Sequence, residues 1–104
     1  MSARKKGGGT GGGPRNPAYT GTIQIQPEAL EDLTHWVETE PRIARKVLRL
    51  VEAARRDPFR GEGKPEPLKD LGSDVWSRRI TQEDRLVYRV TSTGIDVLQA
   101  RFHY

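Results

Sequence analysis

The composition of the first twenty residues most constrains what this chain can fold into. They contain two runs of three glycines, two prolines and four basic side chains, without a single acid. A stretch of this kind buries almost no apolar surface, so we predict a flexible basic tail over residues 1–20. Folding is then left to residues 21–104, a single domain with a core so small that partners or oligomers would add to its stability.

The positive charge of the chain belongs to the predicted tail. The formal net charge is +4, and the four basic residues of the tail (Arg4, Lys5, Lys6 and Arg15) account for all of it. Removing them from the 18 basic residues of the chain leaves 14, which equals the number of acids. The sequence pI near 9.8 is therefore weak support for nucleic-acid binding, which would depend on how the charges are arranged.

Several classes of site and location are disfavoured by what the chain lacks. There is no cysteine, so disulfides and thiolate metal sites are excluded. The two histidines are far apart and stand near no cluster of carboxylates, so we expect neither a metal nor another cofactor. No apolar run matches a membrane span, and no apolar stretch follows the basic start, so we expect a cytoplasmic protein.

The first half of the predicted domain reads as a strand and two helices. Alternation of Ile23 and Ile25 with polar neighbours predicts a strand over 22–26. Pro27 and Pro41 each suit the first turn of a helix. Apolar residues then recur at helical spacing, as Leu30, Leu33, Trp36 and Val37 after the first proline and as Ile43, Val47, Leu50, Val51 and Ala54 after the second. The short join between them predicts an antiparallel hairpin.

The second half reads as a loop followed by three strands. Residues 59–73 are rich in Gly, Pro and Lys and predict an ordered loop. Three strands are then predicted over 75–81, 85–90 and 95–102, and the polar turns between them favour an antiparallel meander. The predicted fold class is α+β, with the two helices on one face of the sheet and the other face free for a ligand.

One carboxylate in the predicted loop stands between two prolines. Pro65 and Pro67 restrict the backbone on both sides of Glu66, so its side chain is held in place. Lys64 and Lys69 flank this unit. Considered alone, the segment is explained equally well as a rigid solvated turn.

A basic group occupies the predicted strands and consists of Arg78, Arg79, Arg85 and Arg89. Alternation turns Leu86, Tyr88 and Val90 toward the helices and the arginines toward the open face. Their planar guanidinium groups suit phosphate oxygens. For any single arginine, ordinary surface charge is the better explanation, so the signal lies in the group.

The chain ends in Arg101-Phe102-His103-Tyr104, directly after an apolar strand. This position can anchor the end at the sheet edge, although terminal residues are commonly frayed. Regular alternation would place His103 and Tyr104 on opposite faces, and the sequence leaves their arrangement open.

Taken together, these segments resemble the YoeB family of RelE-like toxins, over residues 22–104 in one unbroken register. The segments are Asp57-Pro58-Phe59 with Gly61, Gly63-Lys64-Pro65-Glu66-Pro67-Leu68-Lys69, Trp76-Ser77-Arg78-Arg79-Ile80, Arg85-Leu86-Val87-Tyr88 and Arg101-Phe102-His103-Tyr104. The resemblance implies a RelE-like α+β domain that enters the ribosomal A site and cuts messenger RNA there. Two departures are Phe102, where the family often has Tyr, and the glycine-rich tail.

The same resemblance implies roles for individual residues. Glu66 matches the general base, Arg85 the phosphate-stabilising residue, His103 the general acid and Tyr104 the closing residue of the site. Lys69 matches an accessory basic position, and we expect Lys64, Lys69, Arg78, Arg79 and Arg89 to contact RNA. Chemistry agrees with this assignment, because metal-independent cleavage through the 2′-hydroxyl needs a base, a cation for the phosphorane and an acid for the leaving oxygen.

The resemblance also implies partners: the 70S ribosome and its messenger, and a YefM-type antitoxin that holds the toxin inactive. A homodimer is a further expectation that the family allows. An alternative function is a binding module that acts mainly as a co-repressor with its antitoxin on operator DNA. A third reading gives the basic tail a role in binding ribosomal RNA or another polyanion.

Overall fold

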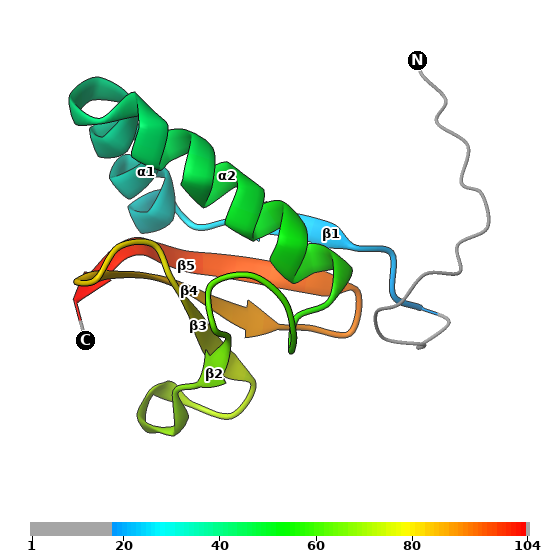
Figure 1. Cartoon of the computed structure of the whole chain (residues 1–104). Helices are drawn as coiled ribbons and strands as arrows, with labels where there is room; N and C mark the ends of the chain where they lie inside the picture. The colour runs from blue at the N-terminus through cyan, green and yellow to red at the C-terminus, as the bar shows by residue number, and fades with distance from the viewer. Residues whose placement is uncertain (1–17, 104) are drawn as a thin grey trace, which may run out of the picture.

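The computed structural model describes residues 18–103, which form two helices on one face of a five-stranded sheet (Figure 1). The elements, in chain order, are β1 (Thr22–Ile25), α1 (Pro27–Thr39), α2 (Pro41–Arg56), β2 (Glu66–Pro67), the short 3₁₀ helix η1 (Lys69–Leu71), β3 (Val75–Arg79), β4 (Asp84–Val90) and β5 (Gly94–His103). The predicted α+β class, helix pair and antiparallel meander are confirmed. No helix among the described residues is long and apolar enough to cross a bilayer.

The order of strands across the sheet is β1-β5-β4-β3-β2, and only β1 runs parallel to its neighbour. This parallel pairing brings the start of the domain beside its last strand. A Cβ at Gly94 would lie 1.9 Å from the carbonyl oxygen of Thr22, so only glycine permits this close approach. Residues 1–17 of the predicted tail lie outside the described range, whereas Tyr19 and Thr20 contact the domain through Arg55 and Thr93.

Both helices begin at the predicted prolines, and their buried faces form the main core with the inner face of β4 and β5. Trp36 is buried there, and its indole N–H donates to the carbonyl of Ala100 at 2.8 Å. Leu30 and Val37 recur at the same helical spacing as Trp36, but both residues are 54% exposed. Ala29 on the same helix is buried instead.

The prediction that the second sheet face is free is wrong in part. The segment predicted as a loop contains β2, which pairs with the edge of β3, and η1. These elements carry Leu68 onto the face opposite the helices, where it forms a second apolar cluster. The cluster consists of Leu68, Val75 and Val87, with Leu98 and Phe102 packed against them. Part of the open face therefore lies beneath β2 and η1.

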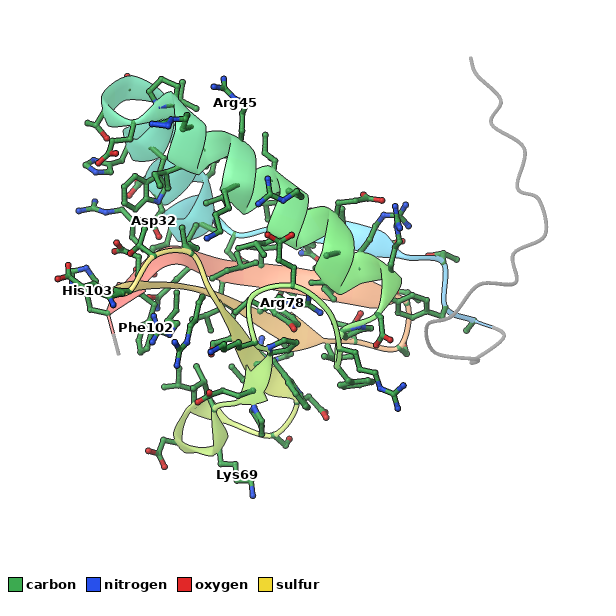
Figure 2. All side chains as sticks on the ribbon, in the orientation of Figure 1. Asp32, Arg45, Lys69, Arg78, Phe102 and His103 are labelled. Atoms are coloured by element: carbon green, nitrogen blue, oxygen red, sulfur yellow. The ribbon has the colours of Figure 1, made fainter. Side chains whose placement is uncertain are left out.

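Arg78 is completely buried, so the prediction that it lies on the open face and contacts RNA is corrected (Figure 2). It pairs with Leu86 across β3 and β4, on the helix side of the sheet. Its Nε donates to the hydroxyl of Tyr88 at 3.0 Å, and Nη1 donates to the carbonyl of Glu62 at 3.0 Å. Nη2 donates to two further carbonyls, of Asp57 at 2.6 Å and Arg60 at 2.8 Å.

We predict that Arg78→Lys destabilises the domain by about 3 kcal/mol or more, because one ammonium group cannot reach four acceptors. Tyr88→Phe should reduce the free energy of unfolding by about 1–3 kcal/mol, since Tyr88 also donates to the carbonyl of Pro58 at 2.6 Å. Urea unfolding at neutral pH measures both. Arg60→Lys, at an exposed position, is the control, and its free energy of unfolding should stay within about 0.5 kcal/mol of wild type. Equal stability of all three variants would refute the role of this network.

Burial raises the pKa of Tyr88 above its ordinary value of 10.0, with Arg78 opposing the change. A group with a raised pKa in the folded state stabilises the fold below its unfolded pKa and loses that contribution as pH rises through the folded pKa. We therefore expect the free energy of unfolding to fall from about pH 10 upward. Tyr88→Phe should show a shallower alkaline decline than wild type, measured by urea titrations at a series of pH values. Parallel declines would contradict this.

Candidate functional site

Glu66 lies on the edge strand β2, where proline on either side of it is tolerated because no outer strand needs its N–H. The backbone is tied to β3 on both sides of Glu66. Arg79 N donates to Gly63 O at 2.7 Å, and Leu68 N donates to Val75 O at 2.8 Å. The carboxylate is therefore exposed on a backbone held at two points.

The register of the sheet places Glu66 on the face opposite the main core. Glu66 pairs with Ser77, and Ser77 pairs with Val87. Two residues further along, Arg79 pairs directly with Arg85 on this same face. Like charges opposite each other destabilise a sheet by about 0.2–1 kcal/mol relative to a neutral pair. Such a pair is an arrangement that an anion would stabilise.

Arg85 is held by the turn between β3 and β4. Its Nη1 donates to the carbonyls of Thr81 and Gln82, both at 3.2 Å, and to that of Asp84 at 3.4 Å. These contacts fix one edge of the guanidinium group, so its position relative to the sheet is set before any ligand arrives.

His103 contacts a carboxylate that sequence reasoning missed. Its Nε2 lies 2.9 Å from Oδ1 of Asp84, the residue opposite it in the sheet. Asp84 is only 8% exposed, and its other oxygen accepts a hydrogen bond from the hydroxyl of Thr81 at 2.9 Å. Because a carboxylate oxygen accepts, this contact assigns the proton to Nε2 and leaves Nδ1 for another partner. The pairing of residues 84 and 103 is visible only once the strand register is known.

The predicted catalytic residues are brought to one end of the sheet but not to one point. Arg85 and His103 line the same surface hollow, together with Gln82 and Glu83. Glu66 is outside it, on a strand two places from β4 and three from β5, which corresponds to about 10 Å and about 14 Å. Tyr104 lies outside the described residues. A ligand that contacts Glu66 and His103 together would have to be extended.

The remaining predicted RNA contacts are spread over the surface. Lys64 is exposed, with a positive φ of 52°. Lys69 begins η1 (Figure 2). It borders two hollows beside β2. Arg89 is four residues from Arg85, about 13 Å along β4, and its Nη1 lies 3.8 Å from Asp96. Among residues 18–103, no three His, Asp or Glu side chains gather as a metal site would require.

Neutralising Arg79 should relieve the repulsion from Arg85. We predict that Arg79→Gln raises the free energy of unfolding by about 0.2–1 kcal/mol in dilute buffer. The gain should shrink as salt approaches about 1 M, because salt screens exposed charges. Urea unfolding at several salt concentrations measures this, with Arg60→Gln as the control. A loss of stability, or a gain that does not depend on salt, would contradict the repulsion.

Comparison with protein families gives a match over residues 25–104 to the YoeB-like toxin of bacterial type II toxin–antitoxin systems. Toxin YoeB of Escherichia coli K12 is 49% identical over 77 residues, which cover 74% of this chain and 92% of that toxin. Toxin RelK of Mycobacterium tuberculosis is 45% identical over 83 residues, covering 80% and 98%.

Solved structures agree with these sequence matches. The YoeB/ParE toxin from Agrobacterium tumefaciens superposes with a TM-score of 0.73 at 44% identity, covering 79% of this chain and 98% of that one. A YoeB–YefM complex from Staphylococcus aureus gives a TM-score of 0.70 at 34% identity, covering 80% and 97%. The DinJ–YafQ complex of E. coli, at 13% identity and a TM-score of 0.60, shows likeness of fold alone.

Proposed function

Because the chain belongs to the YoeB-like toxins of bacterial type II toxin–antitoxin systems, we propose that it is a ribosome-dependent endoribonuclease. It cleaves messenger RNA in the ribosomal A site without a metal ion and so inhibits translation. The observation that carries this proposal is the cationic end of the open sheet face. Arg79 and Arg85 stand side by side there, and His103, which pairs with Asp84 at the end of β5, lines the same hollow as Arg85.

In this mechanism the RNA supplies its own nucleophile. Glu66 takes the proton of the 2′-hydroxyl, and the 2′-oxygen attacks the adjacent phosphorus. Arg85, fixed by its turn, stabilises the negative charge of the phosphorane. The P–O5′ bond breaks as His103 gives a proton to the departing 5′-oxygen, leaving a 2′,3′-cyclic phosphate. Tyr104 closes the site, and Arg79 adds a second positive charge beside the phosphate.

Asp84 acts on this reaction through His103. Its contact with Nε2–H orients the ring, so that in the imidazolium form, where both ring nitrogens carry a proton, Nδ1–H faces the leaving oxygen and gives up its proton to it. The burial of Asp84 and its hydrogen bond from Thr81 hold the carboxylate in position. Asp84 is therefore a positioning residue, because nothing in this scheme brings it to the substrate.

The distance between Glu66 and His103 supports a requirement for the ribosome. Residues on strands about 14 Å apart cannot act on one phosphodiester unless the RNA is held in a defined path and the side chains close on it. An open sheet face supplies little enclosure of its own. Lys64, Lys69 and Arg89 surround this face and would contact the RNA backbone along that path.

Three substitutions test the catalytic assignment. Glu66→Gln and His103→Gln should each slow cleavage of a defined messenger on 70S ribosomes by about 10²–10⁴-fold. Arg85→Ala should slow it by about 10²–10³-fold. Cleavage is followed in excess EDTA, with and without ribosomes, and ribosome binding is measured in parallel. Near-normal cutting by all three variants would refute the assignment.

Matched controls are available in this chain. Glu28→Gln removes an exposed carboxylate at the start of α1, and Arg60→Ala removes an exposed guanidinium group in the loop after α2. Both should cleave as wild type does. No cleavage by a folded wild type that binds ribosomes would instead favour the alternative role, a co-repressor that works with its antitoxin on operator DNA.

The partners of related toxins support a YefM-type antitoxin as the neutralising partner of this chain. S. aureus YoeB has been solved in complex with YefM, as a heterotetramer, and as a dimer. Ile23, Ile25, Leu30 and Val37 on β1 and α1 are exposed apolar side chains, which fits a surface that a partner covers. We propose binding to such an antitoxin, operator DNA contact through that complex, and a homodimer when the antitoxin is absent.

A further inference from the structure

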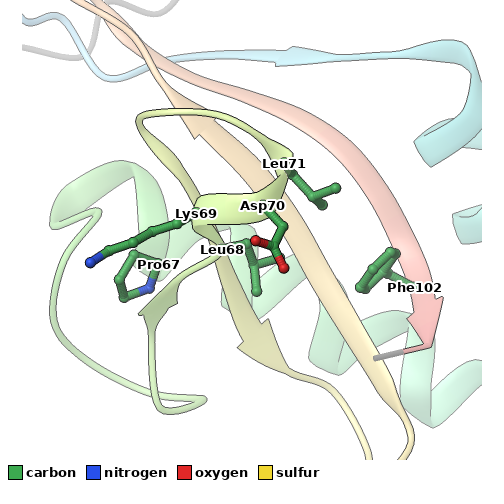
Figure 3. Close-up of a pocket in the computed structure, with 6 residues that line it drawn as sticks. All are labelled: Pro67, Leu68, Lys69, Asp70, Leu71 and Phe102. Carbon is green, nitrogen blue, oxygen red and sulfur yellow. The ribbon is translucent and has the colours of Figure 1, made fainter.

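We propose that the hollow between η1 and the end of β5 is a nucleobase pocket that selects guanine (Figure 3). This inference rests on the proposed ribonuclease function and names a substrate determinant for it. The hollow has a volume of about 380 Å³, near the lower end for ligand pockets and suited to one base more than to a larger ligand. It is lined by Pro67, Leu68, Lys69, Asp70, Leu71 and Phe102.

The walls of the hollow suit a flat aromatic ligand. Leu68 forms its buried floor, whereas Leu71 is 45% exposed. The ring of Phe102 lies across an open gap from Leu71 and Asp70 (Figure 3). Single-stranded RNA bases stack on aromatic side chains of this kind. A base in the gap would cover apolar surface of Leu71 that is otherwise in water.

Asp70 gives the pocket its selectivity. No other described residue forms a hydrogen bond or ion pair with its carboxylate, which opens into the gap (Figure 3). A carboxylate only accepts hydrogen bonds, so it prefers a base edge with two adjacent donors. Guanine offers this edge through N1–H and its 2-amino group. Adenine and cytosine place an acceptor nitrogen beside their amino group, and uracil flanks its N3–H with two carbonyls.

A negative charge on a face that receives RNA is unfavourable unless a contact compensates it. The side chain of Lys69 points away from the gap (Figure 3), so it leaves Asp70 unpaired and can reach the RNA backbone. Hydrogen bonds from guanine N1–H and the 2-amino group would offset the unfavourable negative charge of Asp70. These two bonds are the reason why the pocket selects guanine over the other bases.

The pocket adjoins the proposed catalytic residues at both ends. Pro67 directly follows Glu66, while Phe102 precedes His103 and pairs with Arg85. A nucleotide with its base in the gap would therefore carry its ribose and phosphate onto the face that Glu66 and Arg85 share. The pocket selects the nucleotide that flanks the cleaved bond.

Binding of nucleoside 3′-monophosphates to the full chain tests the pocket without cleavage. In NMR titrations, guanosine 3′-monophosphate should shift the methyl signals of Leu71 and the ring signals of Phe102. Its affinity should exceed that of the adenosine, cytidine and uridine compounds by about 5- to 100-fold, the range for one bidentate base contact. Asp70→Asn should remove most of this preference, and Leu71→Ser should weaken all four compounds alike.

Asp74→Asn is the matched control, since it removes the same charge from an exposed residue outside the pocket. It should keep the guanine preference. Equal affinity for the four compounds, or an unchanged preference in Asp70→Asn, would overturn the proposal. On programmed ribosomes, Asp70→Asn should also lower the ratio of cleavage rates for guanine- over adenine-containing sites. Selective binding by a chain that cuts no message would refute the ribonuclease and leave the pocket standing.

Discussion

The buried guanidinium group of Arg78 is the interaction on which the rest of the structure depends. Removing such a charge from water is unfavourable unless hydrogen bonds replace its hydration. Three carbonyls of the loop after α2 and the hydroxyl of Tyr88 do so. The loop is thereby fastened to β3 just before it leads into β2. Gly63, with a φ of +90°, lets the chain pass within contact distance of Arg78. The position of Glu66 follows from this attachment.

The two faces of the sheet have different roles. Helices cover one face and bury the main core, so stability comes chiefly from that side. On the other face, β2 and η1 cover part of the sheet and leave a cationic end beside an apolar hollow. Arg79 pairs directly with Arg85, and like charges placed opposite each other are the pattern expected where function outweighs local stability. The proposed catalysis and the proposed base pocket both depend on the part of this face that β2 and η1 leave uncovered.

Local patterns predicted much of the fold but misassigned individual side chains. Pro27 and Pro41 mark the starts of both helices, and alternation in β4 correctly separates Leu86 and Tyr88 from Arg85. The roles of Glu66, Arg85 and His103 came from resemblance to a family and stay predictions. Arg78 was misplaced because adjacent strand residues point to opposite faces, so Arg78 and Arg79 cannot both face outward. Leu30 is exposed although it shares the helical spacing of Trp36, because that spacing does not say how wide the buried stripe is.

By itself, the sequence determined the α+β class, the order of the first strand, the two helices and the three-stranded meander, and the segments that carry the candidate site residues, because helix starts, alternation and turns depend on residues close in the chain. Tertiary structure alone decided the parallel pairing of β1 with β5, the attachment of β2 to β3 and the contact between Asp84 and His103. These arrangements join residues far apart in the sequence. They depend on strand register and on how the core packs, and neither is encoded in any local stretch of residues.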